Sequence, residues 1–405
     1  MKQGNKLQHL LLNSNPWFSA VSDYSLQLAI YLREKNSILY CSEIGSTAME
    51  KKCLENKIPF ENAPIHNQSI INFFKSFIFL NKHLYKNKNS LKYIWVFEGR
   101  EHSLCAISKI IFPFLWKDRV LIRVRGQAQS ISSNLFSRLM YNVMTNKIVF
   151  AANCVKNRVK FEIPFEKTII QYYSKNFKTN YPRNNDEAKS IYIDVSLPPI
   201  KSENLLYVVV GRFDKVKGHD YLLDAFLKAD FINKNGEKIK SQMIFLGYNA
   251  NLSAGRLYEN YFKKFGEGLF VQNKYYLKSQ ILNKELYIIS EKMNNIDELI
   301  SMAHFGVIPS LDSEVICRVG VEFLQCGTPV ISSDAGALPE VFSDFKELIF
   351  PVGNTESLKN CLESSSKIFL DKNSYSENRR KAKKIGAERF SLKNYDNLYE
   401  FINRN

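Results

Sequence analysis

Two glutamates, Glu314 and Glu322, flank a mostly apolar segment with seven residues between them. The residue types around them predict a loop, a helix beginning near Glu314, a Gly-Thr-Pro turn and a buried strand over 329–333. At ~1.5 Å per residue, such a helix separates the two carboxylates by roughly 12 Å along its axis. A buried carboxylate without a partner is costly, so each should meet a donor group or solvent. The plainer alternative is a helix N-terminal acid followed by an exposed helix acid.

Two cations follow another expected strand. The apolar run at 205–211 leads into Arg212, Lys217 and then a helical pattern. Both cations therefore fall at a strand-to-helix turn, beside the positive end of the helix dipole. A guanidinium that forks two oxygens, next to an ammonium point charge, suits a diphosphate. Ordinary surface basicity is the alternative for these two residues taken alone.

Length and composition bound the class of protein. A chain of 405 residues exceeds one ordinary core and predicts two domains, and 45% hydrophobic with 24% charged residues is a globular composition. No apolar run approaches the ~20 residues needed to span a bilayer, and the N-terminus is typical of a buried first strand rather than a signal peptide. The seven cysteines are scattered, without a CxxC pair. This pattern favours reduced thiols in a cytoplasmic protein and argues against a structural zinc site.

The net charge of +16 has two interpretations. An excess of this size indicates a nucleic acid or an anionic membrane surface as partner. Much of the excess is lysine in a chain that is also rich in asparagine and isoleucine, which compositional drift would produce without any partner. Both interpretations stay open at this point.

Apolar runs alternate with longer amphipathic segments along the whole chain, which indicates βαβ units on parallel sheets. Helical patterns lie between the runs, for example at 24–35 and 103–112. Open α/β sheets bind ligands at the carboxyl ends of their strands, so chemistry is expected just after each run. The expected strands are 7–13, 37–42, 92–97, 120–125 and 147–152 in the first half, and 205–211, 242–247, 305–310 and 329–333 in the second.

The segments GRFDKVKGHDYLLDAF and PSLDSEVICRVGVEFLQCGTPVISSDAGALPEV resemble the family-4 retaining glycosyltransferases, also called group 1 glycosyltransferases. The resemblance covers both halves in order and is most specific over about residues 205–345. It implies an α/β chain of the GT-B fold, with two Rossmann-like doubly wound domains facing across a cleft. We expect an acceptor domain at 1–180, a linker at 181–204, a nucleotide-sugar domain at 205–390, and a helix at 391–405 that packs back on the first domain.

The resemblance also implies roles for the residues singled out above. Glu314 should hold hydroxyls of the donor sugar, and Glu322 the ribose hydroxyls of the nucleotide. The diphosphate should lie between them, against Arg212, Lys217 and the backbone at the helix start. Those fixed cations would stabilise the leaving nucleoside diphosphate, so we expect no metal and no cofactor besides the donor substrate. The backbone positions expected to bind the donor are Ile316, Cys317 and Arg318, where many relatives carry a small, glycine-containing triplet.

The first half departs from the family pattern at two places. Ser19 and Ala20 stand where many relatives have paired glycines that approach the phosphates, and we place them in the donor site. Arg125 stands near the position of a histidine that many relatives carry by the donor sugar. Either Arg125 or His102 is the expected catalytic substitute, and the alternative for His102 is a structural histidine.

We therefore expect a cytoplasmic glycosyltransferase that moves a sugar from a nucleotide-sugar to a lipid-linked, lipopolysaccharide or other polysaccharide acceptor, with retention and without a metal. Segments 69–92 and 109–117 place apolar residues beside lysines, which suits the inner face of an anionic membrane or, equally, an ordinary packed helix. The alternatives are another GT-B enzyme, such as a nucleotide-sugar epimerase, and a basic nucleic-acid-binding protein. No nucleic-acid-binding signature is present, so we expect no nucleic-acid partner.

Overall fold

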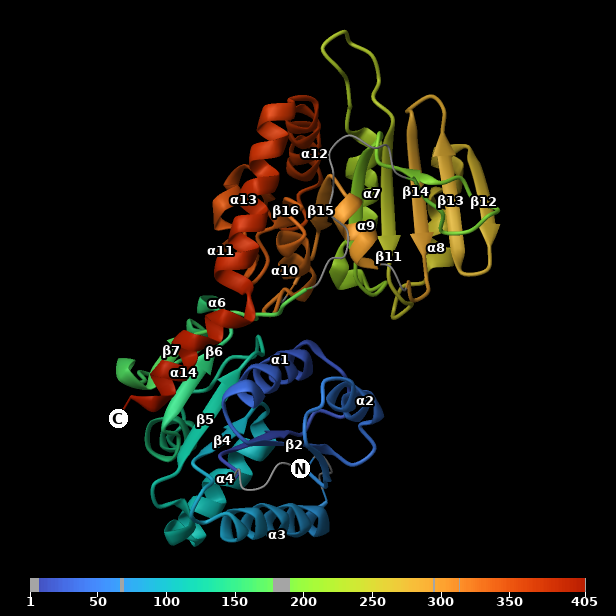
Figure 1. The fold of residues 1–405 in the computed structure, drawn as a ribbon. Coiled ribbons are helices and arrows are strands. Elements are labelled where there is room, and N and C mark those ends of the chain that lie inside the picture. The colour runs from blue at the N-terminus through green and yellow to red at the C-terminus, as the bar shows by residue number, and fades with distance from the viewer. Residues whose placement is uncertain (1–6, 66–68, 178–189, 294–295, 313, 405) are drawn as a thin grey trace. The chain divides into compact units, whose positions relative to one another are not determined.

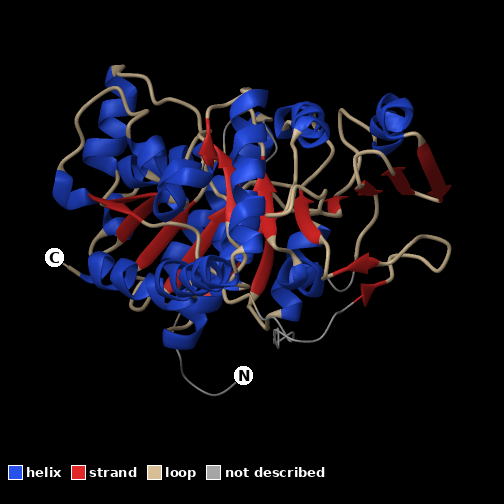
Figure 2. Cartoon of the chain, turned by 90° about the horizontal axis from the view of Figure 1, so that it is seen from above, coloured by secondary structure: helices blue, strands red, loops and turns tan. Residues whose placement is uncertain are grey.

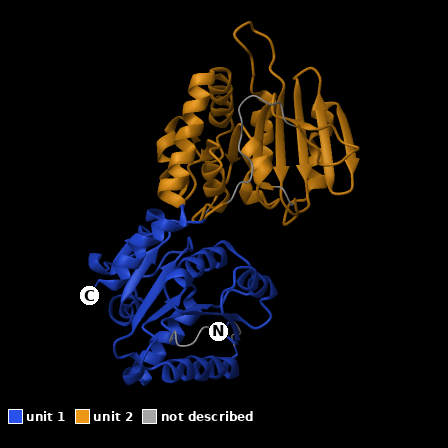
Figure 3. Ribbon diagram, viewed as in Figure 1, with its two compact units in different colours: residues 1–175, 391–405 blue, residues 176–390 orange. Residues whose placement is uncertain are grey.

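The computed structural model describes residues 7–65, 69–177, 190–293, 296–312 and 314–404. The chain divides into two compact units, coloured separately in Figure 3. The first unit comprises residues 1–175 and 391–405, and the second comprises residues 176–390. Figure 2 shows helices and strands together along the chain, the composition of α/β units. None of the described helices is both long and apolar enough to cross a membrane.

The first unit is built on a parallel sheet. Its central strands are continuous apolar runs, with Leu10, Leu11 and Ile94 fully buried, because helices cover both faces of the sheet. The sheet order is β3-β2-β1-β4-β5-β6-β7. The strands are β1 His9–Asn13, β2 Ile38–Glu43, β3 Phe60–Ala63, β4 Tyr93–Val96, β5 Val120–Arg125, β6 Lys147–Phe150 and β7 Thr168–Ile170.

Helices of the first unit connect these strands. Some of the helix N-termini carry hydroxyl or amide caps; for example, Ser69 accepts the Asn72 N–H at the start of α3. The helical segments are α1 Ala20–Lys35, α2 Thr47–Glu55, α3 Ile70–Lys86, α4 Gly99–Ile111, η1 Pro113–Trp116, α5 Leu135–Arg138, the π-helical η2 Leu139–Met144, α6 Asn153–Lys156, η3 Phe165–Lys167, η6 Leu392–Asn394 and α14 Tyr395–Asn403.

The last helix, α14, belongs to the first unit although the second unit precedes it in sequence (Figure 1). Tyr395, Leu398 and Ile402 are all buried, so the helix contributes apolar surface to the core of this unit. Asp396 accepts a hydrogen bond from the Tyr31 hydroxyl at 2.6 Å and pairs with the Lys35 ammonium at 2.6 Å. These two donors hold the pKa of the Asp396 carboxyl below its usual value. The helix is thus attached to α1 by both packing and charge.

The second unit has a mixed sheet in the order β12-β13-β14-β11-β10-β15-β16-β17. From β14 to β17 neighbouring strands are parallel, whereas β12–β13 and β13–β14 are antiparallel. The strands are β10 Leu205–Val210, β11 Ser241–Leu246, β12 Glu267–Val271, β13 Lys274–Ser279, β14 Lys284–Ile289, β15 Phe305–Ile308, β16 Val330–Ser333 and β17 Ile349–Phe350, with a separate pair β8 Ser190–Ile191 and β9 Ile200–Lys201.

Helices again separate the parallel strands of the second unit. Gly327, with φ of 71°, ends α10 in the left-handed conformation, as the Gly-Thr-Pro turn predicted. The helical segments are η4 Lys215–Lys217, α7 His219–Lys228, α8 Ala254–Phe265, α9 Ile296–Met302, α10 Arg318–Gln325, α11 Leu338–Val341, η5 Ser343–Leu348, α12 Thr355–Leu370 and α13 Lys372–Phe390.

The fold class expected from the sequence is confirmed: both units are α/β domains of the Rossmann type. The strand expected at 120–125 is β5 itself, and the other expected strands match β1, β2, β4, β6, β10, β11, β15 and β16 within a few residues. The structure adds β3, β7, the pair β8–β9, β14, β17 and the antiparallel β12–β13 extension. Of the expected linker at 181–204, residues 181–189 lie outside the described residues, and the rest carries β8 and β9 within the second unit.

Candidate active site

The turn after β10 holds the first pair of charged residues in a fixed geometry. Arg212 Nε lies 3.0 Å from Asp214 Oδ2, and half of the Arg212 side chain is exposed. The other oxygen of Asp214 accepts the Val216 N–H at 3.2 Å and so caps η4. Asp214 itself is buried, so its charge is compensated by these contacts. The carboxylate therefore orients the guanidinium at the carboxyl end of a central strand.

The loop after β15 is bound to this turn. The Leu311 N–H donates to the Val216 carbonyl at 2.8 Å, and the Tyr221 hydroxyl donates to the Pro309 carbonyl. Gly218 makes the close approach possible, because it has φ of 69° and any Cβ there would collide with the Pro309 carbonyl oxygen. β10 and β15 are neighbours in the sheet, so their carboxyl ends meet at one edge.

Glu314 and Lys217 meet at that edge. The Lys217 ammonium pairs with Glu314 Oε1, and the Ser310 hydroxyl donates to the same oxygen at 2.7 Å. The Glu314 side chain is 12% exposed and that of Lys217 is 30% exposed, so the pair is reachable from solvent through the lysine. An ammonium has three donors, which leaves Lys217 able to bind a further anion. The site thus joins a carboxylate and a cation that lie 97 residues apart in sequence.

The predicted start of the helix at Glu314 is wrong, because α10 begins at Arg318. Glu314 lies in a non-helical segment whose carbonyl accepts the Ala337 N–H at 2.7 Å. Gly336 permits this contact, since it has φ of 56° and a Cβ there would lie 2.5 Å from the Glu314 carbonyl oxygen. The separation of roughly 12 Å estimated from helical rise therefore does not describe these two carboxylates. Contacts with another loop prevail over the local helical pattern.

The residues between the glutamates form the entry to α10. Ile316 and Cys317 are buried, and Arg318 and Glu322 are half-buried on the helix. Burial raises the pKa of the Cys317 thiol, which therefore stays protonated. Gly320 leaves room for it, because a Cβ at 320 would lie 2.5 Å from the Cys317 sulfur. The backbone at the helix start and the Glu322 side chain thus remain the groups that a nucleotide could contact.

Ser19 and Ala20, expected near the donor phosphates, lie at the start of α1 in the first unit. The Ser19 hydroxyl caps the helix by accepting the Ser22 N–H at 3.2 Å, and it also accepts a hydrogen bond from the Asn15 amide at 3.0 Å. Ala20 is the first helical residue. The capping hydroxyl already occupies one of the free N–H groups of this helix end. The two residues thus form a capped helix start rather than an open glycine turn.

Arg125 and His102 are both buried in the first unit. Arg125 donates from Nη2 to the Gln129 carbonyl at 2.7 Å, which braces the loop after β5. His102 Nε2 lies 2.8 Å from the Thr145 hydroxyl, whose own hydrogen is donated to the Met140 carbonyl. Burial and the nearby arginines hold the pKa of His102 well below its usual value, so the imidazole is neutral. Such an environment suits the structural alternative for His102 better than a catalytic one.

Several residues of the site were missed from the sequence. Asp214 and Ser310 orient Arg212 and Glu314, and Gly336 admits the Glu314 backbone. The sequence held a signal for the first two of these residues. Asp214 stands just before a short helical turn, and small residues follow β15. The contact of Gly336 with Glu314 had no such signal, because it depends on how two loops fold against each other.

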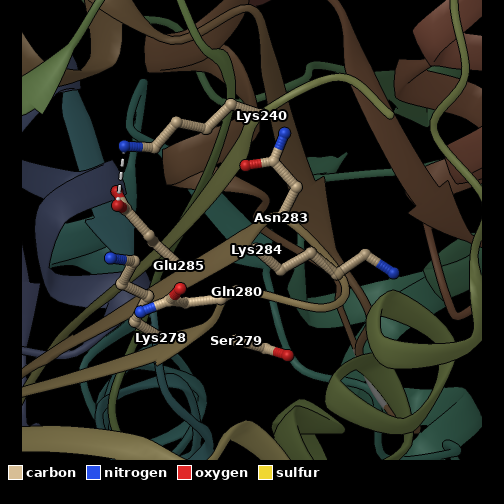
Figure 4. A pocket seen from close by; sticks show the side chains of 7 residues that line it. All are labelled: Lys240, Lys278, Ser279, Gln280, Asn283, Lys284 and Glu285. Atoms are coloured by element: carbon tan, nitrogen blue, oxygen red, sulfur yellow. Dashed lines mark ion pairs between the residues drawn. The ribbon is translucent and has the colours of Figure 1, made fainter. Parts of the chain in front are cut away.

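A polar pocket of about 310 Å³ lies elsewhere in the second unit (Figure 4). Its Lys240 pairs with Glu285 at 2.8 Å, and the Lys284 ammonium donates to the carbonyls of Leu227 and Ala229. Lys240 and Lys284 stand at the amino ends of β11 and β14, the edge opposite to that of Glu314. Its charged groups are thus engaged with one another and with the backbone, and we do not include the pocket in the site.

Comparison with known proteins identifies the second unit. The model of the family described as glycosyl transferases group 1 matches residues 197–386, which include Arg212, Lys217, Glu314 and Glu322. Over these residues the second unit is similar to the group 1 glycosyltransferases. Spore coat protein SA of Bacillus subtilis is 25% identical over 217 residues, which are 51% of this chain and 52% of that protein. The match to this relative therefore spans about half of its length.

Solved glycosyltransferase structures share the fold over nearly the whole chain. A glycosyltransferase from Rickettsia africae superposes with a TM-score of 0.71 at 14% identity, over 98% of this chain and 99% of that one. HepE from Anabaena, in complex with UDP-glucose, gives a TM-score of 0.65 at 14% identity, over 97% and 99% of the two chains. These similarities support the two-domain GT-B fold for this chain.

Proposed function

We propose that this protein is a group 1 glycosyltransferase that transfers a sugar from a nucleotide-sugar donor, with retention and without a metal ion. The observation that carries the proposal is the meeting of Lys217 and Glu314 at the carboxyl ends of β10 and β15, with Arg212 beside them. A cation and a carboxylate held this way can bind the diphosphate and the sugar hydroxyls of one ligand. The ligand of HepE, UDP-glucose, is a donor of this class.

In the proposed reaction, the bond between the anomeric carbon and the diphosphate oxygen breaks as the acceptor hydroxyl bonds to that carbon. The acceptor proton leaves with the nucleoside diphosphate. Arg212 and Lys217 stabilise the negative charge that develops on the departing phosphate, as fixed donors do in other transferases. Both cations are already paired, with Asp214 and Glu314, so their charges are positioned before the donor arrives. Glu314 orients the sugar, and Glu322 accepts the ribose hydroxyls.

A donor screen tests this proposal. UDP-, GDP- and ADP-sugars would be tried for binding by calorimetry and for turnover, with Glu322→Ala as the variant. Loss of a charged acceptor of ribose hydroxyls costs about 1.5–3 kcal/mol, so the affinity for the nucleotide should fall roughly 10- to 150-fold. If no nucleotide-sugar binds the unmodified protein, the proposed function is wrong. Turnover of a nucleotide-sugar without any acceptor, giving an isomeric nucleotide-sugar, would indicate an epimerase instead.

We further propose that the acceptor is lipid-linked and that the first unit lies on the inner face of the cytoplasmic membrane. Ile70, Phe74 and Ile78 recur at helical spacing on α3 and are 58–77% exposed. Ile110, Ile111 and Phe114 are also more than half exposed. The two groups belong to neighbouring segments, because the rings of Phe77 on α3 and of Phe112, next to Ile111, are 5.8 Å apart. Exposed lysines on α3 lie beside this apolar surface: Lys75, Lys82 and Lys86.

An apolar ridge with neighbouring lysines suits an anionic bilayer, where each lysine near the surface contributes about 1 kcal/mol. Co-sedimentation with anionic and neutral vesicles, at low and high salt, tests the idea. The protein should bind anionic vesicles at low salt and detach as salt rises, because screening acts within about 10 Å at 0.1 M. Phe74→Ser should weaken binding, whereas Leu54→Ser, which changes an equally exposed side chain on α2, should not. Failure to bind anionic vesicles at low salt would favour a soluble acceptor.

A further inference from the structure

The carboxyl ends of β1, β4 and β5 bring together an exposed indole and a polar cluster. These strands are neighbours in the order β1-β4-β5, so the residues that follow them share one edge of the first sheet. Trp17 follows β1, Glu98 follows β4 and Gln127 follows β5. This edge is where an open α/β sheet binds its ligand.

The backbone of Trp17 is fixed although its side chain is exposed. Its N–H donates to Asn15 Oδ1 at 2.9 Å, and its carbonyl accepts the Ser22 hydroxyl at 2.8 Å and the Ser19 N–H at 2.9 Å. The side chain is nevertheless 77% exposed. The other two tryptophans of the chain, Trp95 and Trp116, are buried and each donates its indole N–H to a side chain. Trp17 is thus presented to solvent on a braced loop and not used in the core.

Glu98 is held within reach of the same loop. Its Oε2 accepts a hydrogen bond from the Gln127 amide. The neighbouring Glu101 ties the two loops together, since its Oε1 accepts the N–H of Ser14 at 3.4 Å and that of Glu98 at 2.6 Å. Burial, with the nearby Glu101 charge, raises the pKa of Glu98, while the buried Arg123 and the amides of Asn15 and Gln127 act against this rise.

Buried side chains near Glu98 have unused hydrogen-bonding capacity. Arg123 is fully buried, and its Nε and Nη1 have no hydrogen-bond partner within the described part of the chain. The same holds for Glu101 Oε2 and for Nε of the buried Arg125. Buried polar groups are usually paired, so this concentration beside a half-buried carboxylate is unusual for a packed core.

We propose that Trp17, Glu98 and Gln127 form a subsite for a sugar ring at the end of the acceptor. The C–H face of a pyranose packs on an indole, and a carboxylate next to an amide accepts and donates hydrogen bonds to neighbouring hydroxyls. The acceptor therefore ends in a saccharide, and the enzyme extends an existing glycan rather than glycosylating a bare lipid phosphate. This inference rests on the proposed transferase function and specifies the substrate class of its acceptor side.

An isolated exposed tryptophan is common on protein surfaces and would need no explanation. Here the exposed ring, the carboxylate with its amide partner and the unpaired buried guanidinium nitrogens come from three adjacent strands at the ligand edge. Glu101 holds the first two loops at a fixed separation. Their convergence, rather than the exposure of Trp17 alone, carries the inference.

Tryptophan fluorescence provides a test that needs no acceptor of known identity. Acrylamide should quench mainly Trp17, and Trp17→Phe should remove the quenchable part of the emission. The acrylamide quenching would then be measured at increasing concentrations of the methyl glycosides of glucose, galactose, mannose, rhamnose and N-acetylglucosamine. At least one should protect Trp17. Glu98→Gln should raise the glycoside concentration needed for half-protection about tenfold or more, because a hydrogen bond to a charged group is lost. If Glu98→Gln does not fold, Gln127→Leu tests the same subsite.

The control is Phe165→Ala, which removes an equally exposed ring of the same unit, just before β7 and so at the opposite edge of the sheet. It should leave protection unchanged. If no methyl glycoside in the panel protects Trp17 in the unmodified protein, the saccharide subsite is wrong. Calorimetry with UDP, GDP and ADP separates the two proposals. Nucleotide binding without glycoside protection overturns the subsite alone, whereas absence of any nucleotide binding overturns the transferase function.

Discussion

Replacing Glu314 tests two roles of its carboxylate, the ion pair with Lys217 and the hydrogen bond to the donor sugar. The side chain pairs with Lys217, which is 30% exposed, so solvent screening limits the contribution of the pair to stability to about 1 kcal/mol or less. A hydrogen bond from a sugar hydroxyl to the charged carboxylate is worth more, about 1.5–3 kcal/mol. If that bond is made in the transition state, Glu314→Gln should lower kcat/KM roughly 10- to 150-fold. The folded protein should be little affected.

The affinity for the nucleoside diphosphate should not fall in the Glu314 variants, in contrast to kcat/KM. Without the negative charge of Glu314, Lys217 has lost its ion-pair partner and can interact fully with the diphosphate. The dissociation constant should therefore stay the same or decrease, measured by calorimetry on Glu314→Gln and Glu314→Ala. Glu322→Ala serves as the control, because it should weaken the nucleotide complex. A Glu314 variant that keeps its kcat but binds the nucleotide more weakly would show that the carboxylate only positions Lys217, and would refute the role given to it.

Three further outcomes follow from the structure. Gly336→Ala should lower the melting temperature by several degrees, since a left-handed alanine costs about 1–2 kcal/mol, and should also reduce activity because its Cβ meets the Glu314 carbonyl. Gly236 has φ of 81° but open space around it, so Gly236→Ala should lower the melting temperature without lowering activity. Equal losses of activity in Gly336→Ala and Gly236→Ala would contradict this explanation. Burial lowers the pKa of His219 in the folded protein to about 4, whereas the ordinary value is 6.5. Between these two pH values the unfolded chain binds a proton at His219 that the folded protein does not. The free energy of unfolding should therefore fall as the pH drops from 6.5 towards 4. His219→Gln should flatten that decline in urea titrations at pH 7 and 5, and an unchanged slope would exclude His219 as a cause. Activity should survive EDTA because Arg212 and Lys217 are fixed cations, and a loss that magnesium or manganese restores would reject the metal-free mechanism.

The parallel strands were predictable because their sequences signal burial on both faces. Residues 205–210 are a continuous run rich in leucine and valine, and residues 120–125 are apolar except for Arg123 and Arg125; the structure has strands at both. β12 and β13 were missed, since their apolar runs are short and charged residues such as Glu267, Lys274 and Lys278 stand at or near their ends. Such half-exposed antiparallel strands depend on their neighbours for burial, and the local pattern alone does not specify them.

The site was predictable in its residue types but not in its local geometry. Arg212, Lys217 and Glu314 were chosen because cations and acids follow strands, and the structure brings Lys217 and Glu314 into contact. The start of α10 was misplaced by four residues because tertiary contacts, and not helix propensity, decide the path of the chain at Glu314. The cluster around Glu98 gave no sequence signal, since its parts come from separate loops.

The return of α14 to the first unit has a consequence for how the protein is made. The core of that unit includes Tyr395, Leu398 and Ile402, which the ribosome adds only after the whole second unit. At translation rates of about 5–20 residues per second, residues 1–175 wait on the order of 10–40 s for their last helix. During that interval the surface of α1 that later receives α14 is uncovered. We expect chaperones to bind the nascent chain during this interval. To express the first unit alone, residues 391–405 would have to be joined to residues 1–175 by a designed linker.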